Sequence, residues 1–236
     1  MFPHTGWTQL AGAASNDPDQ LDRLIRLYWA PLKVFLVASF PSLRDRADEL
    51  LQNFSEDRIL KEGWLKRADR TRGRFRDLLK SSLKNFVLDH LNKAENRNAP
   101  ASLDDLGHEV AGPDSPSEQF DLAWTRTVLA EVLQRMETDC RDPDANQPRR
   151  THIWEMFQIR ILDPIFNNAE SMPYEQLVNR FGLKTPTDAS NMLLSGKRIF
   201  KAHITNVIEE YCEKDAATAS EVRALEEFIL SLAKRG

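Results

Sequence analysis

Residues 72–86, RGRFRDLLKSSLKNF, carry the clearest helical pattern of the chain. The apolar residues of this stretch recur every three or four positions, which is the spacing of one face of an α-helix, and the pattern continues to about residue 93. We therefore expect a long helix over about 72–93 with its apolar side turned inward. The opposite side carries a basic ridge suited to phosphate oxygens, formed by Arg76, Lys80, Lys84 and Asn85.

Helical spacing also dominates before this stretch, and no alternation of β-branched residues between Asn-Gly or Asp-Gly turns interrupts it. One helix should begin at Asp17 and kink or restart at Pro31, and a second should be capped by Ser42. Three helices with inward apolar faces make one bundle. The sequence thus predicts an all-α protein whose first domain covers residues 1–93.

The region after this bundle is divided by a stretch without periodicity. Residues 94–117 contain three prolines and two glycines, which is typical of a linker. At its end Ser115-Pro116-Ser117-Glu118 forms a capping box, with proline at the first helical position. We therefore place a linker at 94–117 and a C-terminal helical domain at 118–236.

The C-terminal domain should contain a hairpin of two helices at about 170–211. A helix before it is expected to end ahead of Pro164, and Gly182 is placed to end the hairpin's short first helix. A short helix, a glycine-containing turn and a longer helix resemble a helix-turn-helix, although any hairpin in a helical bundle gives the same pattern. Residues 219–233 predict one more amphipathic helix.

Composition and charge limit the classes of function. With two cysteines, scattered histidines and no nucleophile, metal or phosphate-loop motif, we expect no enzyme activity, cofactor or metal. No apolar run approaches a membrane span and no secretory signal is visible, so we expect a cytoplasmic protein without a membrane partner. Residues 58–97 hold twelve basic against five acidic residues, whereas 101–150 hold five against eleven. A polyanion-facing segment would thus be followed by a linker or partner-facing one, unless these charges only solvate helix faces.

Four motifs in order resemble bacterial RNA polymerase sigma factors of the extracytoplasmic-function type, and more narrowly a divergent sigma-like branch. They are Pro3-His4-Thr5-Gly6-Trp7-Thr8, Tyr28-Trp29-Ala30-Pro31-Leu32, Ala47-Asp48-Glu49-Leu50-Leu51-Gln52-Asn53-Phe54, and Ala68-Asp69 followed by Gly73-Arg74-Phe75-Arg76. The resemblance implies that residues 3–93 correspond to region 2 of such factors. Residues 170–211 correspond more loosely to region 4.

The resemblance also implies binding residues in the first domain. The positions that would dock core RNA polymerase are Asp48, Glu49, Gln52 and Asn53. An ordinary amphipathic helix with solvated charges would show the same string. The positions that would contact and open promoter DNA are Arg74, Arg76, Lys80, Lys84, Asn85 and His90.

The hairpin departs from the family pattern. Region 4 helices place cations where Met192-Leu193-Leu194 stand here, and we expect this segment to pack largely inward. The hairpin's remaining candidates for DNA contact are Asn191, Lys197, Arg198 and Lys201. The sequence leaves two functions open: a sigma-like initiation factor, or a regulatory protein-interaction module that has lost promoter recognition. An anti-sigma or other regulatory protein is a further possible partner.

Overall fold

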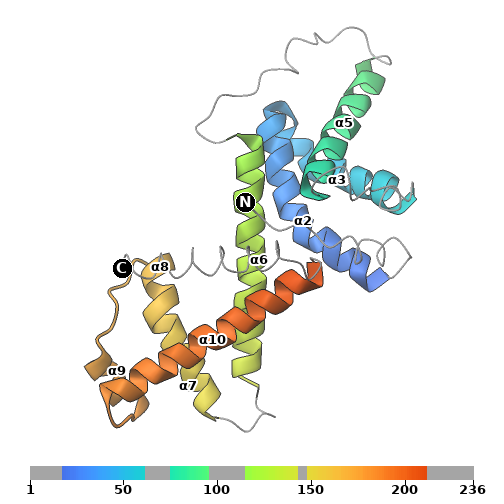
Figure 1. Cartoon of the computed structure of the whole chain (residues 1–236). Helices are drawn as coiled ribbons and strands as arrows, with labels where there is room; N and C mark the ends of the chain where they lie inside the picture. The colour runs from blue at the N-terminus through green and yellow to red at the C-terminus, as the bar shows by residue number, and fades with distance from the viewer. Residues whose placement is uncertain (1–17, 62–74, 96–114, 143–147, 212–236) are drawn as a thin grey trace. The chain divides into compact units, whose positions relative to one another are not determined.

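The computed structural model describes residues 18–61, 75–95, 115–142 and 148–211 (Figure 1). These residues are mostly helical and contain no strand, so the predicted all-α class is confirmed. Among them, no helix is both long and apolar enough to cross a membrane. The motif at residues 3–8, Arg74 and the amphipathic segment 219–233 lie outside the described residues.

The first compact unit extends to Val128. It contains α2 (Pro18–Ser39), the 3-10 helix η1 (Pro41–Arg46), α3 (Ala47–Phe54), the π-helix η2 (Ser55–Lys61), α5 (Phe75–Glu95) and the first half of α6 (Pro116–Cys140). Helix α2 runs without interruption through Pro31, so the restart expected there does not occur. The cap expected at Ser42 is also absent, because that residue lies inside η1 and α3 begins at Ala47.

The core of this unit lies between α2, α3 and α5, as the apolar spacing predicts. Leu36, Phe54 and Val87 come from the three helices and are each 0% exposed. The rings of Phe54 and Phe86 meet edge to face, with centroids 5.6 Å apart. Packing of these apolar faces fixes which sides of α3 and α5 remain for other contacts.

The second compact unit runs from Leu129 to Glu209. After the second half of α6 it contains α7 (Pro148–Phe157), the π-helix η6 (Gln158–Leu162), α8 (Asp163–Phe166), α9 (Tyr174–Phe181) and α10 (Pro186–Tyr211). The helix expected to end ahead of Pro164 continues through it into α8. Helices α7 and α10 pack closely at Gly196, because this residue has no side chain. A Cβ added there would stand 3.3 Å from the Cβ of Phe157.

The division between the units falls within α6 and differs from the linker predicted at 94–117. Phe120 is 0% exposed, and its ring centroid lies 6.4 Å from that of Tyr28 and 6.3 Å from that of Phe35, both on α2. This packing places the start of α6 in the first unit. The predicted capping box is confirmed: the Ser115 amide donates to Glu118 Oε2 at 2.7 Å and the Glu118 amide to Ser115 Oγ at 3.2 Å.

Candidate polymerase and nucleic-acid interfaces

The four candidate polymerase-binding residues lie together on the outer side of α3. Asp48, Glu49 and Gln52 are exposed and Asn53 is half-buried. The inner side of the same helix is fully packed by Ala47, Leu50, Leu51 and Phe54, each at most 1% exposed. We call Asp48, Glu49, Gln52 and Asn53 the α3 ridge. The structure thus presents an acidic and amide surface on a helix anchored by its apolar face.

Exposed cations already pair with the two carboxylates of the ridge. Lys33 Nζ donates to Asp48 Oδ2 at 2.7 Å, and the Arg46 guanidinium makes two bonds of 3.2 Å to Glu49. The bonds from Arg46 hold the pKa of Glu49 below its ordinary value, which favours the charged form of this carboxylate. Exposed pairs of this kind contribute little to stability. A basic partner surface can therefore take their place.

The structure places His90 beside this ridge. Its Nε2 lies 3.5 Å from a guanidinium nitrogen of Arg46, which is itself bound to Glu49. The imidazole is half-buried and lies against Phe86, with ring centroids 6.3 Å apart. His90 was predicted to contact DNA with the α5 cations, but its nearest described polar group is the Arg46 guanidinium that binds Glu49.

The basic ridge predicted along α5 is not continuous at the surface. Arg76 is only 2% exposed and Lys80 only 7%, so the structure corrects their assignment as open phosphate contacts. The reason is that the first half of α6 covers this side of α5. Lys84 and Asn85, one to two turns further on, remain exposed.

Each buried cation has partners on α6. Arg76 lies 3.5 Å from Asp121 Oδ1, and its guanidinium carbon is 4.6 Å from the centre of the Trp124 ring. Lys80 Nζ donates to Ser117 Oγ and lies 5.3 Å from the centre of the Phe120 ring. Lys80 also pairs with Asp77 of its own helix, at 3.0 Å. We call the contacts from Ser117, Phe120, Asp121 and Trp124 to the two cations the α6 cover.

The hairpin of α9 and α10 has the predicted turn. Gly182 ends α9 in the left-handed conformation with φ of 62°, as a C-terminal glycine should. A second capping box, which was not predicted, begins α10. Thr185 Oγ1 accepts from the Asp188 amide at 3.2 Å, and Asp188 Oδ2 accepts from the Thr185 amide at 3.0 Å. Its spacing of Thr-x-x-Asp was the available signal.

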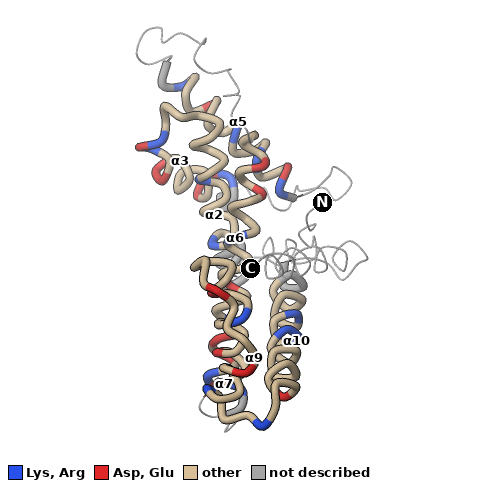
Figure 2. Tube along the Cα trace, turned by 90° about the vertical axis from the view of Figure 1, so that its left-hand side faces the viewer, with Lys and Arg blue, Asp and Glu red and all other residues tan. Residues whose placement is uncertain are grey.

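The outer face of α10 is polar and basic. Met192 and Leu193 are 3% and 6% exposed, as predicted, but Leu194 is 46% exposed, so the segment is not wholly inward. The exposed candidates Asn191, Arg198 and Lys201 share a face with Leu194, and Lys197 is half-buried. We call Asn191, Arg198 and Lys201 the α10 stripe. Figure 2 shows the basic residues along α10 and acidic residues on α3.

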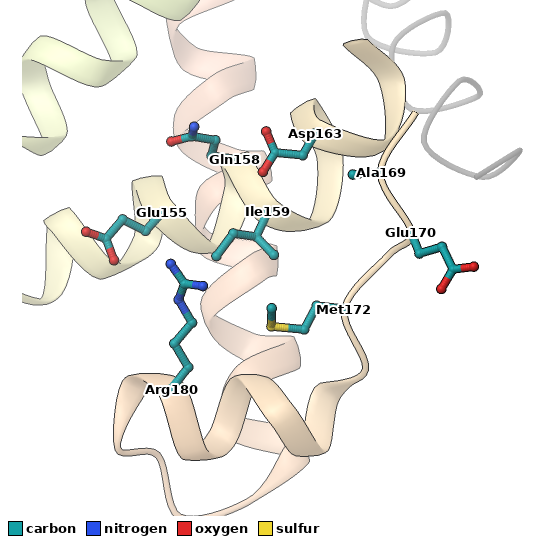
Figure 3. A pocket seen from close by; sticks show the side chains of 8 residues that line it. All are labelled: Glu155, Gln158, Ile159, Asp163, Ala169, Glu170, Met172 and Arg180. Atoms are coloured by element: carbon teal, nitrogen blue, oxygen red, sulfur yellow. The ribbon is translucent and has the colours of Figure 1, made fainter. Parts of the chain in front are cut away.

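A pocket of about 280 Å³ lies within the second unit (Figure 3). It is lined by Glu155, Gln158, Ile159, Asp163, Ala169, Glu170, Met172 and Arg180. Glu170 and Arg180 are exposed and the other polar lining residues are half-buried, so none is held away from water. No group of three or more histidine, cysteine or acidic residues suitable for a metal occurs in the described part of the chain. The pocket therefore gives no indication of a ligand class.

Comparison of the chain with models of protein families, with curated proteins and with solved structures found no match.

Proposed function

We propose that this chain is a sigma-like transcription initiation factor that binds core RNA polymerase through the α3 ridge. The observation that carries the proposal is the two-sided character of α3. Its apolar residues anchor it in the core, while Asp48, Glu49 and Gln52 are presented outward at the positions that the family resemblance implies. Complementary charge on a partner helix would set the orientation and the rate of docking.

Promoter DNA would be held by two sets of exposed residues. On α5 these are Lys84 and Asn85. On α10 they are the residues of the α10 stripe, in which two cations and one amide share a face and Lys197 stands beside them. Cations of this kind position a protein on the phosphate backbone, whereas the amide of Asn191 has the donor and acceptor needed to read an adenine edge. In this function the chain acts in the cytoplasm as a binding protein and not as an enzyme.

A second candidate is a regulatory protein-interaction module that keeps the sigma-like fold without reading promoters. Burial of Arg76 and Lys80 favours it, because two cations proposed to hold DNA are engaged within the protein. An anti-sigma factor or another regulatory protein would then be the partner of the α3 ridge or the hairpin. The two functions differ in whether a complex with polymerase selects promoter DNA.

The test is co-purification of core polymerase with tagged protein. Asp48→Lys with Glu49→Lys should abolish binding, since it reverses two exposed charges of the α3 ridge. The matched control is Glu170→Lys with Glu175→Lys, which changes the net charge equally at exposed positions of the second unit and should leave binding intact. All three proteins should melt alike, because exposed charges rarely control stability.

Retention of polymerase by the Asp48→Lys, Glu49→Lys protein, with melting unchanged, would show that the α3 ridge is not the docking surface. Binding of polymerase without selection of any promoter from a random library would favour the regulatory module. A wild-type protein that captures no polymerase would overturn the initiation-factor proposal.

A further inference from the structure

The α6 cover holds the two charged side chains that are buried in the described part of the chain. Arg76 and Lys80 lie one turn apart on α5, at 2% and 7% exposure. A buried charge requires partners that replace water, and removing such charges from water has a large cost in free energy. The chemistry of these partners therefore shows what this face of α5 is suited to bind.

Both cations meet the same two kinds of group. Arg76 has the Asp121 carboxylate at 3.5 Å and the face of Trp124 at 4.6 Å. Lys80 has an oxygen of Ser117 and the ring of Phe120 at 5.3 Å. An anionic or polar oxygen together with a flat aromatic ring is also what an unpaired nucleotide offers to Arg and Lys. The α6 cover thus resembles, in its functional groups, a short nucleic-acid strand.

We propose that the first half of α6 occupies a nucleic-acid-binding face of α5, so that α6 and a single strand compete for Arg76 and Lys80. Stability alone does not account for these cations, because a buried ion pair is often no better than a well-packed apolar pair. The inference rests on the proposed function for the identity of the competing polyanion. It adds that this face is closed by the chain itself.

The closed state is held by more than the two cations. Phe120 is 0% exposed between Tyr28 and Phe35, so release of α6 would return its ring to water. Ser117 lies in the first turn of α6, two residues after the Ser115 cap. Loss of the cap should fray this turn and separate Lys80 from Ser117, whereas loss of the Asp121 carboxylate should destabilise the closed position of α6 over Arg76.

Two variants open the cover by these different routes. Asp121→Asn removes the carboxylate that faces Arg76, and Ser115→Ala weakens the first turn without changing the net charge. Glu137→Gln is the matched control, since it removes one carboxylate from α6 beyond Val128. In full-length protein, amide exchange of residues 116–128 measures opening, and fluorescence anisotropy with a short labelled single-stranded DNA measures binding.

We expect both variants to exchange faster over 116–128 and to bind the oligonucleotide more tightly, with Glu137→Gln like the wild type. If both cations become available, the plot of log affinity against log salt should steepen by about 1.4, the value for two phosphate contacts on a single strand. Arg76→Gln should then have little effect in the wild type and a large effect in the Asp121→Asn background. Lys80→Gln should behave likewise with Ser115→Ala.

The proposal is overturned if α6 opens in either variant and the affinity and salt slope stay those of the wild type. It is also overturned if neither variant speeds exchange, because the cover would then not depend on these contacts. If Arg76→Gln lowers oligonucleotide affinity equally in the wild type and in Asp121→Asn, α6 does not block access to Arg76. None of these readouts uses polymerase, so failure of the α3 ridge in co-purification leaves them unaffected, and the reverse also holds.

Discussion

Replacing the buried pair of Arg76 and Asp121 by apolar residues should leave the first unit at least as stable as the wild type. The Arg76 side chain is 2% exposed and that of Asp121 23%, and their nearest atoms are 3.5 Å apart, a long separation for a pair that must offset its loss of water. Arg76→Met with Asp121→Leu removes both charges and lets an unbranched side chain lie on Trp124. By comparison with buried pairs elsewhere, we expect a gain of between about 0 and 4 kcal/mol in the free energy of opening.

The single change Asp121→Leu should have the opposite sign. It leaves the Arg76 guanidinium buried without this carboxylate, a situation that typically lowers stability by about 3–5 kcal/mol. Because Asp121 is partly exposed and the Trp124 ring still faces the guanidinium at 4.6 Å, we expect the low end of that range, about 3 kcal/mol. The two changes together should therefore be much less damaging than Asp121→Leu alone.

Hydrogen exchange by mass spectrometry is the assay, because it measures the opening of α5 and the first half of α6 separately from the second unit. Peptides that cover 75–95 and 116–128 should exchange faster in Asp121→Leu and no faster than the wild type in the double variant. A double variant that is as destabilised as Asp121→Leu, or more so, would refute the reasoning. It would show that the ion pair itself stabilises this fold.

Other features of the two units lead to smaller effects. Gly182→Ala should destabilise α9 by about 1–2 kcal/mol in urea denaturation, because φ is 62° there and a residue with a Cβ is strained in this conformation. No neighbouring atom lies within 4 Å of an added Cβ, so backbone strain and not a clash is the expected cause, and unchanged stability would contradict it. Ser115→Ala should weaken the start of α6 by about 1 kcal/mol, read from the exchange of its first amides. Hydrogen bonds from the Ser115 amide and hydroxyl hold the pKa of Glu118 below its ordinary value of 4.5. The charged Glu118 side chain therefore stabilises the start of α6 above that value, and this stabilisation is lost as the pH falls through the lowered pKa. Amide exchange compared at neutral and acidic pH would show this loss. Burial raises the pKa of the Cys140 thiol, so in a Cys212→Ser background alkylation should be slow until the protein unfolds, and rapid labelling of folded protein would contradict the buried position.

The sequence was sufficient for some features that depend on neighbouring residues in the chain, although the cap expected at Ser42 and the helix end expected ahead of Pro164 were wrong. Apolar spacing predicted α5, which the structure places at Phe75–Glu95. The Ser115 and Glu118 capping box and the stop at Gly182 depend on local backbone groups, and both occur as expected. Such features need no knowledge of what packs against the helix, which explains why they were predicted correctly.

The cover on the polar face of α5, which depends on a distant segment, was not predicted. A polar face opposite an apolar one usually indicates a face exposed to solvent. On α5, however, that face contacts α6, where a carboxylate and an aromatic ring pair with a cation of α5. Asp121 and Trp124 were assigned to a separate domain beyond a linker, so nothing in the sequence brought them to Arg76. The segment Met192-Leu193-Leu194 packs largely inward as expected, and Leu194 is exposed because three consecutive residues of a helix cannot all face the buried side.

The difference between the α3 ridge and the covered face of α5 lies in what their ions already bind. Asp48 pairs with Lys33 between side chains that are 66% and 44% exposed, so a basic partner exchanges one weak surface pair for another. Arg76 is released only when Asp121 and Trp124 withdraw and the aromatic packing around Phe120 is disturbed. Under the proposed function, docking through α3 therefore requires no rearrangement of the first unit, whereas use of Arg76 and Lys80 does. A partner protein that binds the open position of α6 more tightly than the closed one would raise the affinity of α5 for nucleic acid. The increase can be no larger than the difference between the partner's affinities for the open and the closed position, and the partner need not contact the strand.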